Sequence, residues 1–159
     1  MLKFDRLLVP VDFSHDSMAA LGYALDLARK LEGPQTVVAL YVVDEGLPVA
    51  LEASSVGSQG RKEQERAMKK AATEQIEAFV AAVDPGEETL EIAVVAGRPV
   101  SETICNFASG GQVDMIVIGA QGKGALRRLV LGSTMQQVQR LATCPVLAVK
   151  DPYALRDSD

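Results

Sequence analysis

The sequence contains no tryptophan, a single histidine and two cysteines, and aromatic residues make up only 4% of its 159 residues. Structural zinc normally takes four Cys or His ligands, so His15, Cys105 and Cys144 are too few to build a zinc fold. A Ser-His-Asp triad would have to use His15, and there is no Gly-x-Ser-x-Gly turn to expose a serine nucleophile. We therefore find no efficient catalytic constellation, and expect two reduced structural thiols and a histidine at the surface.

Basic residues are in the minority, because 16 Lys+Arg stand against 21 Asp+Glu and the formal net charge is −5. This balance lacks the electrostatic footprint of a protein that binds nucleic acid or an anionic membrane. No apolar run reaches the roughly 20 residues of a membrane helix. Residues 1–6 mix charged and apolar side chains, unlike a signal peptide. We expect a cytoplasmic protein without membrane insertion, with one domain over 1–150 and a polar tail at 151–159.

Five short, continuous apolar runs are typical of strands that are covered on both faces. They lie at 7–11, 37–43, 90–96, 115–118 and 146–149. Apolar residues at helical spacing predict four intervening helices, which begin near Ser14, Lys62, Pro99 and Gly132. This alternation predicts a single-domain α/β fold, with an open, Rossmann-like, five-stranded parallel sheet and helices on both faces. The segment 45–66, rich in serine, glycine and charge, is expected to form a long surface loop.

Ligands in an open α/β sheet bind outside the carboxyl ends of the strands, at a topological switch point. The fourth apolar run is followed there by three glycines within residues 119–124. Glycines allow the backbone N–H groups to face an anion. The helix expected after Gly132 adds unpaired N–H groups and the hydroxyls of Ser133 and Thr134. The segment therefore predicts a phosphate site.

The glycine segment matches neither of two better-known phosphate motifs. A P-loop requires Ser or Thr after its lysine, and Gly124 follows Lys123 here. In the dinucleotide fingerprint the third glycine would fall on Arg127, and the motif would follow the first strand, not the fourth. Plainer interpretations stay open, since Gly119 and Gly122 could be turn glycines, and the hydroxyls after Gly132 could cap the helix.

The charged residues near the strand ends also have two interpretations each. Asp12 follows the first strand and could contact a ligand or only cap and orient the next helix. Lys123, Arg127 and Arg128 could neutralise phosphate or remain solvated. Asp44 and the glutamate after it could anchor Mg²⁺ or be ordinary loop acids, so the metal ligands stay unknown.

The spacing resembles that of a known family. Gly119-x-x-Gly122, nine residues and then Gly132-Ser133 match the ATP-binding signature of the universal stress protein family. Other segments resemble its first strand, the end of its second strand, the turn into its third helix and its closing strand, and these are 9–14, 41–44, 97–99 and 144–149. The similarity extends from about Phe4 to Lys150, nearly the whole chain.

The resemblance implies strand order 3-2-1-4-5, a homodimer formed through the last strand, and ATP bound between the first and fourth strands. It implies that Asp12 lies beside the adenosine, that Val42 offers its backbone to the adenine, and that Pro10 and Val11 line this pocket. Ribose and phosphates would be held by the glycines and hydroxyls of the signature, with Ile118 at the pocket floor: Gly119, Gly122, Gly132, Ser133 and Thr134. ADP and AMP remain alternatives to ATP, and Mg²⁺ is expected with the nucleotide.

Three functions follow as hypotheses. The first is a regulatory nucleotide-binding module of the stress response, in which ATP occupancy alters the binding of an unidentified protein partner. The second is a slow ATPase or self-phosphorylating protein, slow because no base or nucleophile for phosphoryl transfer is recognisable. The third is a nucleotide-free dimeric scaffold.

Overall fold

The computed structural model describes residues 4–32, 35–44, 58–83, 89–121 and 132–151. Its elements are β1 (Arg6–Pro10), α1 (His15–Lys30), β2 (Thr36–Val43), α3 (Ser58–Ala81), β3 (Thr89–Ala96), α4 (Val100–Gly110), β4 (Met115–Gly119), α5 (Ser133–Leu141) and β5 (Val146–Val149). The strands form a parallel sheet in the order β3-β2-β1-β4-β5. The predicted α/β class, parallel sheet and strand order are confirmed. No helix among these residues is long and apolar enough to cross a membrane.

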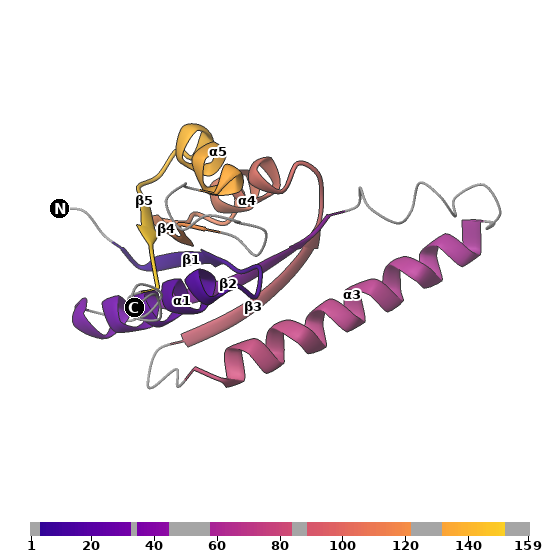
Figure 1. Ribbon diagram of the computed structural model, residues 1–159, viewed down its shortest axis with the longest axis horizontal. Helices are drawn as coiled ribbons and strands as arrows, with labels where there is room; N and C mark the ends of the chain where they lie inside the picture. Colours follow the sequence, from indigo (N-terminus) through magenta and orange to yellow (C-terminus); the bar gives the residue numbers. More distant parts are fainter. Residues whose placement is uncertain (1–3, 33–34, 45–57, 84–88, 122–131, 152–159) are drawn as a thin grey trace, which may run out of the picture.

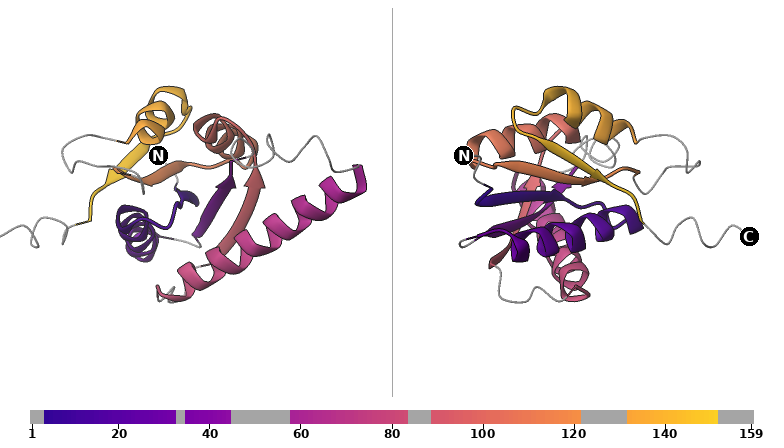
Figure 2. Two further views of the ribbon diagram at one scale, coloured as in Figure 1. Left: turned by 45° about the vertical axis from the view of Figure 1, so that its right-hand side comes forward. Right: turned by 90° about the vertical axis from the view of Figure 1, so that its left-hand side faces the viewer.

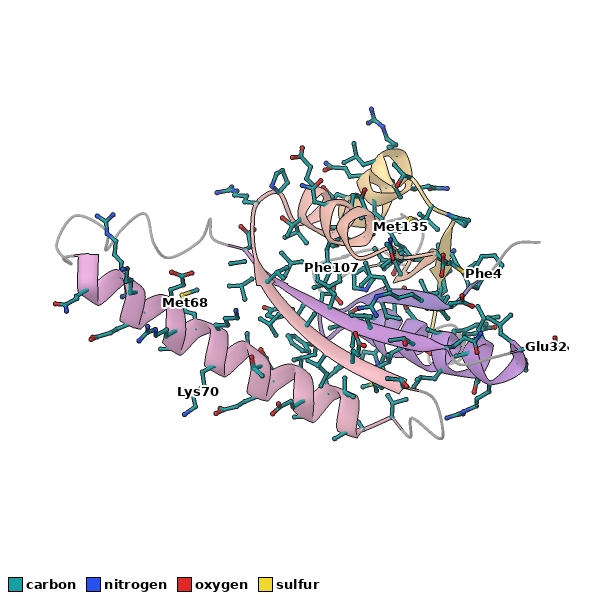
Figure 3. The ribbon with its side chains drawn as sticks, turned by 180° about the vertical axis from the view of Figure 1, so that it is seen from behind. Phe4, Glu32, Met68, Lys70, Phe107 and Met135 are labelled. Atoms are coloured by element: carbon teal, nitrogen blue, oxygen red, sulfur yellow. The ribbon has the colours of Figure 1, made fainter. Side chains whose placement is uncertain are left out.

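Helices cover both faces of the sheet, with α1 and α3 on one face and α4 and α5 on the other (Figures 1 and 2). Strand side chains alternate between the two layers. Leu7 and Val9 join the core beneath α1 and α3, whereas Leu8 joins the core beneath α4 and α5. Figure 3 shows Phe107 and Met135 in this second layer. Burial on both faces explains why the strands are continuous apolar runs in the sequence.

Helix α1 begins as its sequence predicts. The Ser14 hydroxyl is the N-cap and accepts a hydrogen bond from the Ser17 backbone N–H at 3.1 Å. His15 is exposed, as expected, and Arg29 and Lys30 place positive charge in the last turn, where the helix dipole favours it. The N-terminus of α1 is thus fixed directly after β1.

The helix predicted to begin near Lys62 is confirmed, but it begins at Ser58, so the predicted surface loop at 45–66 is wrong over residues 58–66. Residues 45–57 lie outside the described residues. The side chains at 61–67 are all exposed, so no apolar periodicity marked a helix there. Only Ala72, Ile76 and Val80 of α3 are buried. Figures 1 and 2 show the first half of α3 projecting past the sheet, and Figure 3 shows Lys70 pointing away from it.

Cys105 and Cys144 are half-buried free thiols packed against the core beneath α4 and α5. Burial is the main cause that raises the pKa of both thiols; at Cys105 the neighbouring Cys144 adds to the increase, and at Cys144 the carboxylate of Asp114 does. We expect iodoacetamide to label both slowly at pH 8 in the folded protein, faster as pH rises, and at the rate of ordinary thiols in denaturant.

The raised pKa of the two thiols also determines how they change the stability of the protein with pH. A thiol pKa that is higher in the folded than in the unfolded chain contributes stability that is fully present below the unfolded pKa and is lost as pH rises through the folded pKa. Mass spectrometry of the protein after timed exposure to iodoacetamide checks the predicted labelling rates. Equal labelling rates in buffer and in denaturant would contradict the prediction that both thiols are protected by burial.

Candidate functional site

Strands β1 and β4 stop pairing before their carboxyl ends. Their register ends at Leu8 opposite Ile116, although β1 continues to Pro10 and β4 to Gly119. The Arg6 carbonyl accepts a hydrogen bond from the Asp114 backbone N–H at 2.9 Å, so alternation directs the backbone of Pro10 toward β4 as well. Proline has no N–H to continue the ladder. The pairing therefore ends at the switch point of the sheet, where ligands of open α/β folds bind.

Strand β2 presents a backbone edge to the same place. Val11 N–H donates to the Leu40 carbonyl at 2.8 Å, and Gly97 N–H donates to the Val43 carbonyl at 3.1 Å. Because successive residues of a strand point to opposite sides, Val42 directs its N–H and C=O toward β1. β1 ends at Pro10, opposite Leu40, so among the described strands none pairs with Val42 on this side. A ligand with a donor and an acceptor on one edge could pair there.

The turn between β1 and α1 is held by its own polar groups. Asp12 Oδ1 accepts a hydrogen bond from Ser14 N–H at 3.0 Å, and Ser17 Oγ accepts a long one from Asp12 N–H at 3.5 Å. The Asp12 carboxylate thus orients the turn into α1, as the plainer interpretation of this residue had it. It is half-buried at the switch point outside the carboxyl ends of β1 and β4, which we call the crevice.

Phe13, in the same turn, has a left-handed backbone with φ of 65°. This conformation costs a bulky residue about 1–3 kcal/mol. Its ring packs on Tyr41, with centroids 4.7 Å apart, and edge-on against Phe79 of α3 at 5.5 Å. These contacts hold the strained turn in place and connect it to β2 and α3. Sequence analysis missed Phe13; the scarcity of aromatic residues was the one available signal.

The end of β4 lies directly against the first turn of α1. A Cβ on Gly119 would come within 2.8 Å of the Asp16 carbonyl carbon and the Ser17 nitrogen. Glycine is therefore required at 119 by packing within the protein. Ala120 N–H then donates to the Val149 carbonyl at 2.7 Å, and the Ala120 carbonyl accepts from Gly132 N–H at 2.8 Å. The chain that leaves the sheet after Ala120 returns to the same point at Gly132.

The two helices that begin at the crevice differ in how their N-termini are capped. The start of α1 is capped by the Ser14 hydroxyl and carries Asp16 in its first turn. The start of α5 has Gly132 as N-cap, with no side-chain cap hydrogen bond and no acidic residue in the first turn. Ser133 and Thr134 are exposed in this first turn. The first-turn N–H groups and the dipole of α5 are suited to an anion.

The structure thus gathers most of the predicted residues around one crevice. Val11, Val42 and Ile118 are buried in the core layers that border it, Val11 beneath α1 and α3 and the other two beneath α4 and α5. Pro10, Asp12, Gly119, Gly132, Ser133 and Thr134 lie at the strand and helix ends around it. Gly122, Lys123, Arg127 and Arg128 lie outside the described residues.

Acidic side chains near the crevice do not form a metal site within the described ranges, where no group of three His, Cys, Asp or Glu could hold an ion. Asp44 Oδ1 lies 3.9 Å from Arg98 Nε, so this predicted Mg²⁺ candidate forms an ion pair across the ends of β2 and β3. The Arg98 side chain is well exposed and that of Asp44 is partly exposed. The glutamate at 45 lies outside the described residues.

Comparison with known proteins identifies the family of the chain. The model of the universal stress protein family matches residues 3–150. The chain belongs to the universal stress protein family. A universal stress protein of Methanocaldococcus jannaschii is 31% identical to it over 153 residues, which cover 94% of this chain and 84% of the relative.

Two solved structures extend the family comparison to three dimensions. Protein MJ0577, a second universal stress protein of M. jannaschii, superposes with a TM-score of 0.75 at 27% identity, covering 92% of this chain and 96% of its own. A universal stress protein of Archaeoglobus fulgidus, solved in complex with dAMP, superposes with a TM-score of 0.59 at 22% identity, covering 94% and 100%. The second likeness concerns the fold alone.

Proposed function

We propose that this universal stress protein binds ATP in the crevice between the ends of β1 and β4, and that occupancy regulates its binding to a partner protein. The observation that carries the proposal is the uncapped start of α5, brought back to the end of β4 by the hydrogen bond between Gly132 and Ala120. The free N–H groups in the first turn of α5, which can bind phosphate, therefore lie next to the switch point of the sheet.

The adenine fits the edge of β2. Adenine carries an amino donor and a neighbouring ring-nitrogen acceptor, and the backbone of Val42 offers the complementary pair toward β1. Val11 and Ile118 place apolar side chains at the same level of the sheet, which suits a flat ring. Asp12 at the rim is then the carboxylate beside the ribose. The A. fulgidus protein, which shares the fold, was solved with an adenine nucleotide, dAMP.

The phosphates fit the N-terminus of α5. Ser133 and Thr134 add hydroxyl donors to the first-turn N–H groups, and the N-cap Gly132 has no side chain to stand between them and a phosphate. Lys123 supplies positive charge from the same segment of the sequence. Mg²⁺ would enter coordinated mainly by the phosphates and water, because the described acidic residues form no cage for it.

We also propose that the protein is a cytoplasmic homodimer that pairs through β5. This strand is the edge of the sheet next to β4. Leu147 is 38% exposed on it, and Leu141 on the preceding helix is 48% exposed. An apolar edge strand is prone to pair with another chain, and a second copy would cover it.

A substitution of Ser133 by aspartate tests the phosphate site. Ser133→Asp places a carboxylate at the start of α5, where it stabilises the helix dipole but repels phosphate. We expect ATP affinity, measured by titration calorimetry with Mg²⁺ present, to fall by at least about tenfold, because juxtaposed like charges cost several kcal/mol. The thermal midpoint should stay equal or rise slightly.

The matched control is Gln139→Glu, which adds the same charge near the other end of α5, on an exposed side chain. It should bind ATP like the wild type. Titrations with ADP and AMP rank the nucleotides, and phosphate release that disappears with binding in Ser133→Asp would favour a slow ATPase. A wild-type protein with no affinity for any of the three nucleotides would overturn the proposed function in favour of the scaffold.

A further inference from the structure

The carboxylate of Asp16 is buried inside the framework of the crevice. Its residue is 8% exposed, although it lies in the first turn of α1. Its Oδ2 accepts a hydrogen bond from Gln121 N–H at 3.0 Å, and its Oδ1 accepts one from Asp151 N–H at 2.9 Å. These two donors lie two residues beyond the ends of β4 and β5. A single side chain therefore joins the start of α1 to the ends of two neighbouring strands.

Both contacts require a carboxylate. Each of the two oxygens faces a backbone N–H, so an asparagine of the same shape would satisfy only one and turn its own NH₂ toward the other. Hydrogen bonds from N–H groups to a carboxylate are shorter and stronger than those to a neutral group. The positive end of the α1 dipole further stabilises the negative charge at this position. Ser14 already caps α1, so capping does not explain why residue 16 is an aspartate, whereas the two hydrogen bonds do.

Gln121 lies inside the glycine segment and is the last residue described before the gap at 122–131, and its position is set from several sides. The Ser14 hydroxyl donates to its carbonyl at 3.5 Å, and the preceding Ala120 is bonded to both Val149 and Gly132. Among these hydrogen bonds, the one from Gln121 N–H to Asp16 has a charged acceptor. It fixes the direction in which the chain leaves β4.

We propose that Asp16 is a positioning residue that holds the start of the nucleotide loop in its binding geometry and couples that loop to the chain after β5. This rests on the proposed function. Because Gln121 and Asp151 share one carboxylate, a nucleotide that steadies Gln121 also steadies the hydrogen bond of Asp151. The amide of Asp151, beyond the end of β5, is then better protected when a nucleotide is bound.

The experiment compares wild type, Asp16→Asn and the control Asp26→Asn, which neutralises an exposed carboxylate of the same helix that pairs with Arg29. ATP affinity is measured by calorimetry, and amide hydrogen exchange at residues 121 and 151 is followed by NMR with and without ATP. We expect Asp16→Asn to weaken ATP binding by about tenfold, the effect of losing one charge-assisted hydrogen bond. Asp26→Asn should bind as the wild type does.

The exchange data separate positioning from a general loss of stability. In Asp16→Asn, exchange at 121 or 151 should rise at least about tenfold, while the amides of β1 keep their protection. In the wild type, ATP should slow exchange at both 121 and 151. If ATP slows exchange at 121 but not at 151 in the wild type, the coupling between the two segments is overturned. This measurement uses the wild type alone, so it holds even if Asp16→Asn fails to fold.

Two further outcomes overturn the inference as a whole. One is Asp16→Asn binding ATP within twofold of the wild type; the other is unchanged exchange at both amides in that variant. A wild type that binds no nucleotide would instead overturn the proposed function and, with it, the positioning role. The exchange of 121 and 151 in Asp16→Asn without nucleotide would still decide whether Asp16 anchors either segment.

Discussion

Replacing Gly119 with alanine should destabilise the protein by about 1–3 kcal/mol, the usual cost of overpacking a core. The added Cβ would lie 2.8 Å from two backbone atoms of α1, and backbone cannot move aside as a flexible side chain does. The first turn of α1 must shift, and Asp16 shifts with it. Its hydrogen bond to Gln121 is then strained, so we also expect ATP affinity to fall by about tenfold, or about 1.4 kcal/mol. Thermal unfolding and calorimetry measure the two effects.

The matched control is Gly22→Ala, a glycine in the middle of α1 where an added Cβ meets nothing within 4 Å. Alanine favours a helix over glycine, so this variant should be stabilised by about 0.5–1 kcal/mol and should bind ATP normally. The two substitutions are chemically identical and differ only in surroundings. Similar unfolding midpoints for the two variants would contradict the close approach of α1 to Gly119.

The fold was predictable because each strand is buried on both faces and each short helix carries a local signal. Leu7 and Leu8 face opposite cores and are both fully buried, which leaves an uninterrupted apolar run in the sequence. Ser14 marked the start of α1 by its own chemistry. The first half of α3 carried neither signal, since the side chains at 61–67 are all exposed and mostly charged. A solvated helix without a buried face looks like a loop to pattern analysis.

The site was predictable only in part, for a different reason. Glycines and hydroxyls at the strand ends can be recognised from their spacing along the chain. Asp16 could not be, because its partners are 105 and 135 residues away in the sequence and are backbone groups, which carry no residue identity. The packing role of Gly119 was hidden in the same way, since the atoms it must avoid belong to α1.

Replacing Ile76 with alanine should destabilise the protein by about 2–5 kcal/mol, as expected for a large buried side chain. Ile76 is completely buried, and only Ala72 and Val80 accompany it on the buried face of α3. The side chains at 61–67 in the projecting half of α3 are exposed, so the burial that holds the helix to the sheet is concentrated in this small contact. We expect faster tryptic cleavage at its exposed lysines and arginines, followed by mass spectrometry.

Ile92→Ala is the control, because it makes the same change on edge strand β3 at a side chain that is 38% exposed, and should cost less than about 1 kcal/mol. The Ile76 variant should also affect the crevice. Phe79, one turn further along α3, packs against the ring of Phe13 and helps to hold its left-handed turn. ATP binding should therefore weaken in Ile76→Ala and not in Ile92→Ala. An Ile76→Ala protein with unchanged ATP affinity would show that β1 and α1 maintain the turn without α3.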